Sequence, residues 1–132
     1  MDQDQFIGAV GRRCGMSTEQ ATAVTRATLT TLVELIDGGE ARDLADRLPE
    51  PLRAYTFGPA GAAEPFGLDV FVERVSGRAD VDADAARDGV SAVFDVLREA
   101  VDPDVYGAAV AQLPAEYAEV AARSAPDLRP PA

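Results

Sequence analysis

Few residues of this 132-residue chain have side chains suited to catalysis or metal binding. The single cysteine, Cys14, follows two arginines, and neighbouring guanidinium groups favour the reactive thiolate. Cys14 also falls on an apolar helical face, and we expect it to be a small core residue rather than a redox-sensitive thiol. Acidic residues form two pairs, Glu34 with Asp37 and Glu99 with Asp102. Such pairs suit a divalent cation or acid–base catalysis.

A structural role explains the acidic pairs more simply. Asp37 is followed by Gly38-Gly39-Glu40, the spacing of a helix N-cap with an acid at the third helical position. Asp102 precedes Pro103, which places a capping residue before a proline at the first helical position. We therefore expect both aspartates to cap helices and both glutamates to be solvated.

The composition excludes several classes of active site. The chain has 12 basic and 23 acidic residues, a net charge of −11, and all its basic residues are arginine. Without histidine it has no histidine-dependent triad and no imidazole metal site. Without lysine it has no Schiff-base chemistry and no Walker A phosphate loop. We expect no catalytic, cofactor-binding or metal-binding residue, and an enzyme of this composition would have to use groups such as carboxylates.

Charge and hydropathy also indicate where the chain works. An acidic protein repels the phosphate backbone of nucleic acid, so we expect no nucleic-acid partner. No apolar run approaches the ~18 residues of a membrane span, and residues 1–4 are acidic where a signal peptide would be basic. One cysteine allows no intramolecular disulfide. These features predict a soluble, cytoplasmic protein that makes no contact with membranes.

The chain contains an internal repeat. Residues 71–120 align without gaps on residues 6–55 at a constant offset of 65, and ten of the 50 pairs are identical. Chance would give roughly two to four identical pairs, so we interpret the segments as two copies of one unit. The identical pairs are Phe6/Phe71, Val10/Val75, Arg13/Arg78, Ala21/Ala86, Ala27/Ala92, Leu32/Leu97, Glu34/Glu99, Asp37/Asp102, Leu48/Leu113 and Pro49/Pro114.

Each copy has the pattern of a small helical bundle. A first helix is followed by a stop at Gly15 and by the capping-box sequence that starts at Ser17; Asp82 holds the matching position in the second copy. The long helix that follows carries an apolar stripe in both copies. The stripe residues are Ala21, Thr25, Leu29, Leu32 and Ile36, and Ala86, Val90, Phe94, Leu97 and Val101.

Two shorter helices complete each copy. The third helix of the first copy runs from about Glu40 to Leu48, and a fourth begins at the proline that follows, in each copy. The predicted inward residues of the third helices are Ala41, Leu44, Ala45 and Leu48, and Tyr106, Ala109, Val110 and Leu113.

These elements predict one all-α domain over residues 1–132. It consists of two tandem repeats of three to four helices, packed with approximate two-fold pseudosymmetry so that each covers the other's apolar face. Repeat one spans 5–56, a linker rich in glycine and proline spans 57–67, and repeat two spans 68–121. A proline-rich tail, 124–132, is expected to fray.

The closing motifs of the two copies resemble a known family. The stretch Leu48-Pro49-Glu50-Pro51-Leu52-Arg53 and the triplet Gln112-Leu113-Pro114 are similar to those of the bacterial domain of unknown function 2267 family. The resemblance extends from Phe6 to about Ala121. It implies an all-α, two-repeat domain and supplies no activity, cofactor or catalytic residue. Members often have a tryptophan after the first Leu-Pro segment, and this chain has residues 55–58, Tyr-Thr-Phe-Gly, instead.

Aromatic and arginine side chains leave two alternatives open. Tyr55, Phe57, Phe66 and Tyr117 lie near the junction of the copies, where they either seal the seam or form an exposed partner-binding surface. The matching arginines of the two copies suit either a symmetric anion site or, more simply, exposed helix ends where they complement the macrodipole.

The leading functional hypothesis is a non-catalytic, acidic helical module for protein–protein interaction, self-association or regulation. The alternative is small-molecule binding in an apolar pocket between the repeats, gated by Leu29 and Phe94. An enzyme that uses carboxylates is the third hypothesis.

Overall fold

The computed structural model describes residues 2–36, 38–56 and 66–117, and helices are the only regular secondary structure among them. The predicted all-α fold in one packed domain is confirmed. Most of the predicted linker, residues 57–65, and the whole predicted tail, 124–132, lie outside the described residues.

The helices of the second half follow those of the first at the offset of the sequence repeat. The first half contains α1 (Gln3–Cys14), α2 (Thr18–Leu32), α3 (Gly38–Arg47), α4 (Glu50–Arg53) and the 3-10 helix η1 (Ala54–Thr56). The second half contains α5 (Leu68–Ala79), α6 (Ala83–Ala100), α7 (Pro103–Ala111) and the 3-10 helix η2 (Ala115–Tyr117). The helices α5, α6 and α7 each begin 65 residues after α1, α2 and α3.

Side-chain caps fix the starts of α1, α2 and α6. Gln20 donates its backbone N–H to Ser17 Oγ at 3.1 Å, and the Ser17 N–H donates to Gln20 Oε1 at 3.4 Å, so the predicted capping box of α2 is confirmed. The Asp82 carboxylate accepts a backbone N–H of α6 at 2.8 Å, as predicted. A capping box of Asp2 and Gln5, which we did not predict, starts α1. Each cap satisfies N–H groups that the helix itself leaves without partners.

The long helix of the first half is shorter than predicted. α2 ends at Leu32, and residues 33–36 form turns instead of continuing the helix to Ile36. Backbone bonds from Glu34 N–H to Thr31 O and from Leu35 N–H to Leu32 O tighten the chain here. The tighter winding lets the adjacent side chains of Leu35 and Ile36 both reach the core, where they are 1% and 2% exposed.

The prolines that follow Leu48 and Leu113 start different structures. Pro49 is the N-cap residue of α4, so the predicted fourth helix of the first half is confirmed as a short helix. Pro114 precedes only the 3-10 helix η2, and the chain beyond Tyr117 lies outside the described residues.

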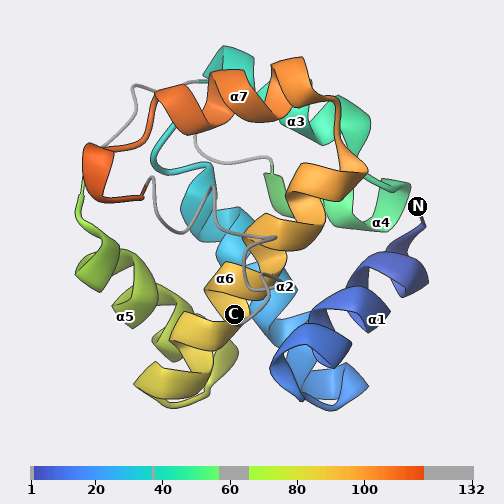
Figure 1. Cartoon of the computed structure of the whole chain (residues 1–132), viewed down its shortest axis with the longest axis vertical. Helices are drawn as coiled ribbons and strands as arrows, with labels where there is room; N and C mark the ends of the chain where they lie inside the picture. The colour runs from blue at the N-terminus through green and yellow to red at the C-terminus, as the bar shows by residue number, and fades with distance from the viewer. Residues whose placement is uncertain (1, 37, 57–65, 118–132) are drawn as a thin grey trace, which may run out of the picture.

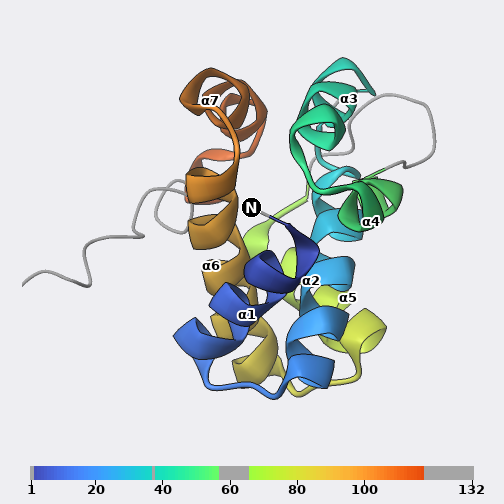
Figure 2. The ribbon, with the colours of Figure 1, turned by 90° about the vertical axis from the view of Figure 1, so that its right-hand side faces the viewer.

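The two halves pack through each other's helices. Figure 1 shows α2 and α6 crossing at the centre, with α1 and α5 on opposite sides and α3 and α7 across the top. α1 packs on α6 and α5 packs on α2, so each half contributes a helix that covers the long helix of the other. In the rotated view α3 and α7 form a separate layer above the crossing (Figure 2). No described helix is long and apolar enough to cross a membrane.

The long helices α2 and α6 pack closely against each other at Gly89. A Cβ atom at this position would meet the Cγ1 atom of Val24 on α2 well inside van der Waals contact. Val24 and Gly89 occupy matching positions of the sequence repeat. The absence of a side chain at Gly89 therefore permits the crossing of α2 and α6.

One apolar core runs through both halves. All ten residues of the two predicted stripes are buried: Ala21, Thr25, Leu29, Leu32, Ile36, Ala86, Val90, Phe94, Leu97 and Val101. Phe6 and Phe71, which match in the repeat, are both 0% exposed. The helical spacing of apolar residues thus predicted the core of the domain correctly.

Candidate functional site

The Glu34 side chain lies in an ion-pair cluster between the end of α2 and α5. Arg78 donates from Nη2 to Glu34 Oε2 at 2.8 Å and from Nη1 to Oε1 at 3.2 Å, and Arg74 donates to Oε1 at 2.9 Å. The Glu34 side chain is only 20% exposed. The prediction that Glu34 is solvated is wrong, because both arginines lie 40 to 44 residues further along the chain and cannot be recognised from one helix.

The arginines keep Glu34 ionised. Burial alone raises the pKa of the Glu34 carboxyl, but the hydrogen bonds and charges of Arg78 and Arg74 outweigh burial and place the pKa below its ordinary value. Glu34 therefore holds no proton near neutral pH that it could give as a general acid. Its carboxylate stabilises the contact between the halves.

A second ion pair of the same kind joins α1 to α6. Arg13 Nη2 donates to Glu99 Oε2, and Arg13 Nη1 lies 3.6 Å from the Asp95 carboxylate. Both arginines of the repeat lie in the last turns of their helices, as predicted. Arg13 matches Arg78 and Glu99 matches Glu34, so the repeated charges pair with each other across the halves. The sequence signal for these ion pairs was that an arginine and a glutamate both recur at the offset of 65 residues.

A groove of about 300 Å³ lies next to the Glu34 cluster. We call it the seam groove, because it is lined by helices of both halves: Ala23, Arg26, Ala27 and Thr30 of α2, Tyr55 of η1 and Arg78 of α5. Two guanidinium groups and two hydroxyl groups supply polar atoms and positive charge to a lining that is otherwise apolar. Leu29 and Phe94, the predicted gates of an apolar pocket, are buried in the core and do not line this groove.

Arg26 is an exposed cation on the wall of the seam groove. Its guanidinium carbon lies 5.0 Å from the centroid of the Tyr55 ring, which is a cation–π distance. The Thr30 hydroxyl donates to the Tyr55 backbone carbonyl at 3.5 Å and ties η1 to α2. Within the described part of the chain, no carboxylate forms an ion pair with Arg26.

The four aromatic residues predicted near the seam lie in different environments. Tyr117 is fully buried, donates its hydroxyl to the Phe66 carbonyl at 2.8 Å, and packs edge-on against Phe71 with centroids 5.7 Å apart. Phe66 is half-buried, and Tyr55 is half-buried at the groove. Phe57 lies outside the described residues. Tyr117 therefore belongs to the core and not to an accessible surface, because its ring is fully buried against the ring of Phe71.

Cys14 is the last residue of α1 and lies half-buried against the core. Its thiol donates to the Val10 carbonyl at 3.1 Å. Burial, followed by the negative charge of Asp88, raises the pKa of the Cys14 thiol. A thiol with a raised pKa is a poor nucleophile, which agrees with the predicted packing role.

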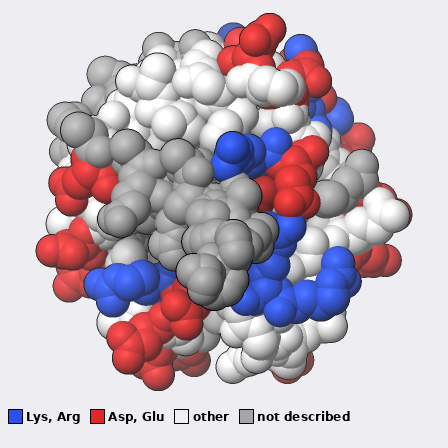
Figure 3. All heavy atoms as spheres, viewed as in Figure 1, with Lys and Arg blue, Asp and Glu red and all other residues white. Residues whose placement is uncertain are grey.

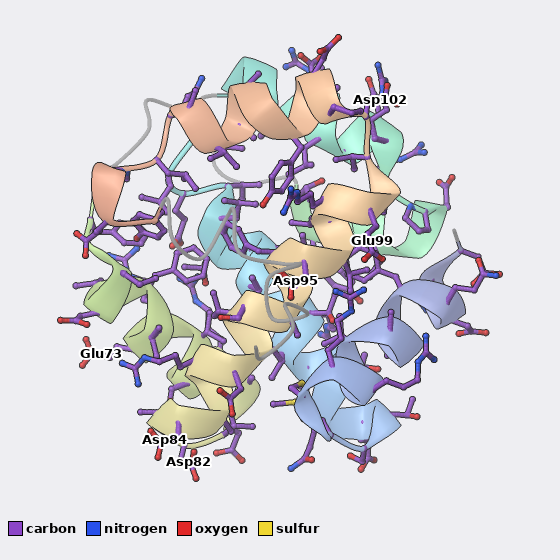
Figure 4. All side chains as sticks on the ribbon, in the orientation of Figure 1. Glu73, Asp82, Asp84, Asp95, Glu99 and Asp102 are labelled. Carbon is purple, nitrogen blue, oxygen red and sulfur yellow. The ribbon has the colours of Figure 1, made fainter. Side chains whose placement is uncertain are left out.

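Other carboxylates predicted to act as caps or metal ligands are spread out. Figure 4 shows Asp82 at the lower end of α6 and Asp102 beyond its upper end. In the described ranges, no cluster of three or more Cys, Asp or Glu side chains is suited to a metal ion. Asp102 is the N-cap residue of α7, but its side chain makes no capping bond and instead pairs with Arg47 of α3 at 3.1 Å. The predicted side-chain cap is wrong because a charged donor from another helix takes the carboxylate; Asp37 lies outside the described residues.

One side of α7 carries small, uncharged residues that the described part of the chain leaves partly or fully exposed. Ala109 is its only residue described as buried, whereas the matching helix α3 buries Ala41, Leu44 and Ala45. Val105, Tyr106 and Val110 pack against the core. The α7 face is the opposite, outer side of the helix and consists of three small residues without charge, the exposed Gly107 and Ala111 and the half-buried Ala108. The space-filling view shows an uncharged area over this part of the molecule (Figure 3). Tyr106 and Val110, which were predicted to be inward residues, are half-buried and pack against the core.

Comparison with known proteins gives a family match over most of the chain. No curated protein matches the chain. Residues 3–120 match the model of a family described as Uncharacterized conserved protein (DUF2267). The matched segment begins with α1, extends beyond η2 and contains the Leu-Pro motifs of both halves. The chain therefore belongs to the DUF2267 family of uncharacterized conserved proteins.

Proposed function

We propose that the chain is a non-catalytic interaction module that associates with a second copy of itself through the α7 face. The observation that supports this function is the uneven burial of α7. A helix that is apolar on all sides is normally buried, and among the described helices α7 makes its main contacts with α3 and α6. The remaining side exposes apolar atoms to water, and association would remove them from water.

The net charge restricts where a second copy could bind. The chain carries a net charge of −11, so most approaches of two copies bring like charges together. Within α7, Asp104 is the only charged residue, and it lies in the first turn. Gly107 and Ala111 are small, exposed and four residues apart, so they would permit two α7 helices to pack closely across a two-fold axis.

The substitution Gly107→Glu tests this proposal. A side chain at Gly107 meets no other atom within 4 Å, so the fold should accept glutamate there. In a dimer the two new carboxylates would face each other near the axis and repel. In sedimentation equilibrium we expect the wild-type mass to rise from 13.8 kDa toward twice that value as the concentration approaches about 1 mM, and Gly107→Glu to remain monomeric.

Gly77→Glu is the matched control. Gly77 is an exposed helical glycine of α5, and a side chain there also meets no atom within 4 Å. Both substitutions add one negative charge and replace a helical glycine, but only one lies on the α7 face. We expect Gly77→Glu to dimerise like the wild type. A wild-type chain that stays at 13.8 kDa at every concentration would contradict the proposal.

A second candidate function is small-molecule binding, which the seam groove favours. Its volume of about 300 Å³ matches the lower end of the range for ligand sites. Residues from α2, η1 and α5 line it, so a ligand would contact both halves at once.

We also infer that the chain arose by internal duplication and works in the bacterial cytoplasm without binding nucleic acid. The repeat of ten identities and the common offset of the helix starts support duplication. The strong negative charge supports the absence of a nucleic-acid partner.

A further inference from the structure

The charge of the seam groove is opposite to that of the molecule. Two of the six lining residues are arginines, Arg26 and Arg78, in a chain with a net charge of −11. Arg74 adds a third guanidinium group next to the groove, against the single carboxylate of Glu34. The groove is therefore a local positive site on an acidic protein.

Arg26 is prepared to bind a ligand. Its guanidinium group rests over the Tyr55 ring and forms no ion pair within the described ranges. Stacking on an aromatic ring limits the orientations of the planar fork, so that less entropy is lost when it binds. A planar fork of N–H donors matches the oxygens of a carboxylate or a phosphate.

Arg78 has donors to spare for the same ligand. A guanidinium group has five N–H donors. Arg78 makes three hydrogen bonds to described residues: one to Thr31 Oγ1 at 2.8 Å and two to the Glu34 carboxylate. The bound Glu34 carboxylate shows that this guanidinium binds an oxyanion. Its other donors form no hydrogen bond to a described residue, and Arg78 lines the groove.

The sequence repeat provides an internal comparison. At the offset of 65, the groove residues Ala23, Arg26 and Thr30 correspond to Asp88, Ser91 and Asp95 of α6. The second half therefore has two carboxylates and no arginine where α2 has a cation. The ion pairs of Arg13 and Arg78 are common to both halves, so the scaffold does not require the positive lining. The lining is particular to the side that contains Arg26.

We propose that the seam groove binds a small molecule through an oxyanion group, a carboxylate or a phosphate, held between Arg26 and Arg78. This inference rests on the second candidate function and adds the ligand class. The Thr30 hydroxyl on the groove wall supplies a further polar contact. Glu34 and the ligand would bind the same Arg78 guanidinium, so anion binding is coupled to the ion pair that joins the halves.

The experiment is a titration of the full chain followed through its backbone amide resonances in nuclear magnetic resonance spectra. The probes are benzoate, its neutral counterpart benzamide, and phenyl phosphate, all at low ionic strength. We expect benzoate or phenyl phosphate to shift the amides near Arg26, Thr30 and Tyr55, and benzamide to leave them unchanged. The anion with the lower dissociation constant shows whether the groove prefers a carboxylate or a phosphate.

Two charge-matched variants locate the binding site. Arg26→Gln removes the exposed cation of the groove, and Arg12→Gln removes an exposed arginine from α1, which does not line the groove. We expect the dissociation constant of the bound anion to rise about tenfold in Arg26→Gln, as for the loss of a charge-assisted hydrogen bond, and to stay within about twofold in Arg12→Gln.

The outcomes distinguish the binding of an oxyanion from the binding of small molecules in general. If benzamide binds as tightly as benzoate, the groove binds small molecules but the oxyanion class is wrong. If no probe shifts the groove amides, small-molecule binding at this site fails as well. Equal weakening in both variants would show a general effect of net charge and would overturn the assignment to Arg26.

Discussion

At the residue scale, Glu34 shows how the fold determines the chemistry of a carboxylate. Two guanidinium groups from α5 bind its oxygens and lower its pKa, so the group acts as a fixed anion between the halves. Cys14 shows the opposite effect, because burial raises the pKa of its thiol and so favours the protonated form, which is the weaker nucleophile. Glu34 and Cys14, two of the side chains that the sequence offered for catalysis or metal binding, therefore contribute to packing and to ion pairs in the fold.

Replacing Glu34 with glutamine tests this role. The substitution removes the anion and leaves Arg74 and Arg78 near each other, so we expect the free energy of unfolding at pH 7 to fall by about 1 kcal/mol. Urea unfolding followed by circular dichroism measures the change. Glu99→Gln is the control: it breaks the matching pair with Arg13, but the Glu99 side chain is 50% exposed, so its effect should be smaller. Equal losses would contradict the importance of burial.

The effect of Glu34 should depend on pH in a defined direction. A carboxyl group with a lowered pKa in the folded state stabilises the fold above its ordinary pKa of about 4.3, and this stabilisation is lost as the pH falls through the lower, folded value. The difference between wild type and Glu34→Gln should therefore shrink as the pH falls from 7 toward about 3. A difference that does not change with pH would show that the charge of Glu34 is irrelevant.

Individual charged residues could be predicted only in part. The sequence placed Arg13 and Arg78 at helix ends, and the structure agrees. It did not reveal that they bind Glu99 and Glu34, because these contacts depend on how two helices meet across the seam. Spacing along one helix contains no information on such long-range pairs.

At the element scale, the crossing of α2 and α6 depends on one glycine. A methyl group at Gly89 would overlap with Val24, and a packed core resists such insertion. We expect Gly89→Ala to lower the free energy of unfolding by about 1–3 kcal/mol. Gly77→Ala is the control, since its methyl group meets nothing within 4 Å and alanine favours a helix. It should raise stability by about 0.5–1 kcal/mol. A stabilising Gly89→Ala would contradict the close crossing.

The sequence predicted helices better than it predicted their ends and exposed faces. Apolar spacing identified both long helices, and capping residues located their first turns at Ser17 and Asp82. The end of α2 at Leu32 was missed because core packing of Leu35 and Ile36 favours tighter winding there. The uncovered α7 face was missed because one helix contains no signal for how far its neighbours extend.

At the scale of the whole molecule, both proposed binding surfaces depend on the packing of one half on the other. The seam groove takes α2 and η1 from the first half and α5 from the second. α7 is held in place by α3 of the other half and by α6. Arg13 with Glu99 and Arg78 with Glu34 join the same two halves. We therefore expect each half of the chain to fold only when it is packed against the other half.

Circular dichroism of the separated halves tests that claim most directly. Residues 1–60 and 61–132 would be produced separately and measured alone and as an equimolar mixture, each at about 10 μM. A unit of about 60 residues buries little surface alone, and here its apolar faces lose the helices that cover them. We expect each half alone to show little helix and no cooperative thermal unfolding, and the mixture to recover both. Cooperative unfolding of either half alone, at the temperature of the full chain, would contradict the account.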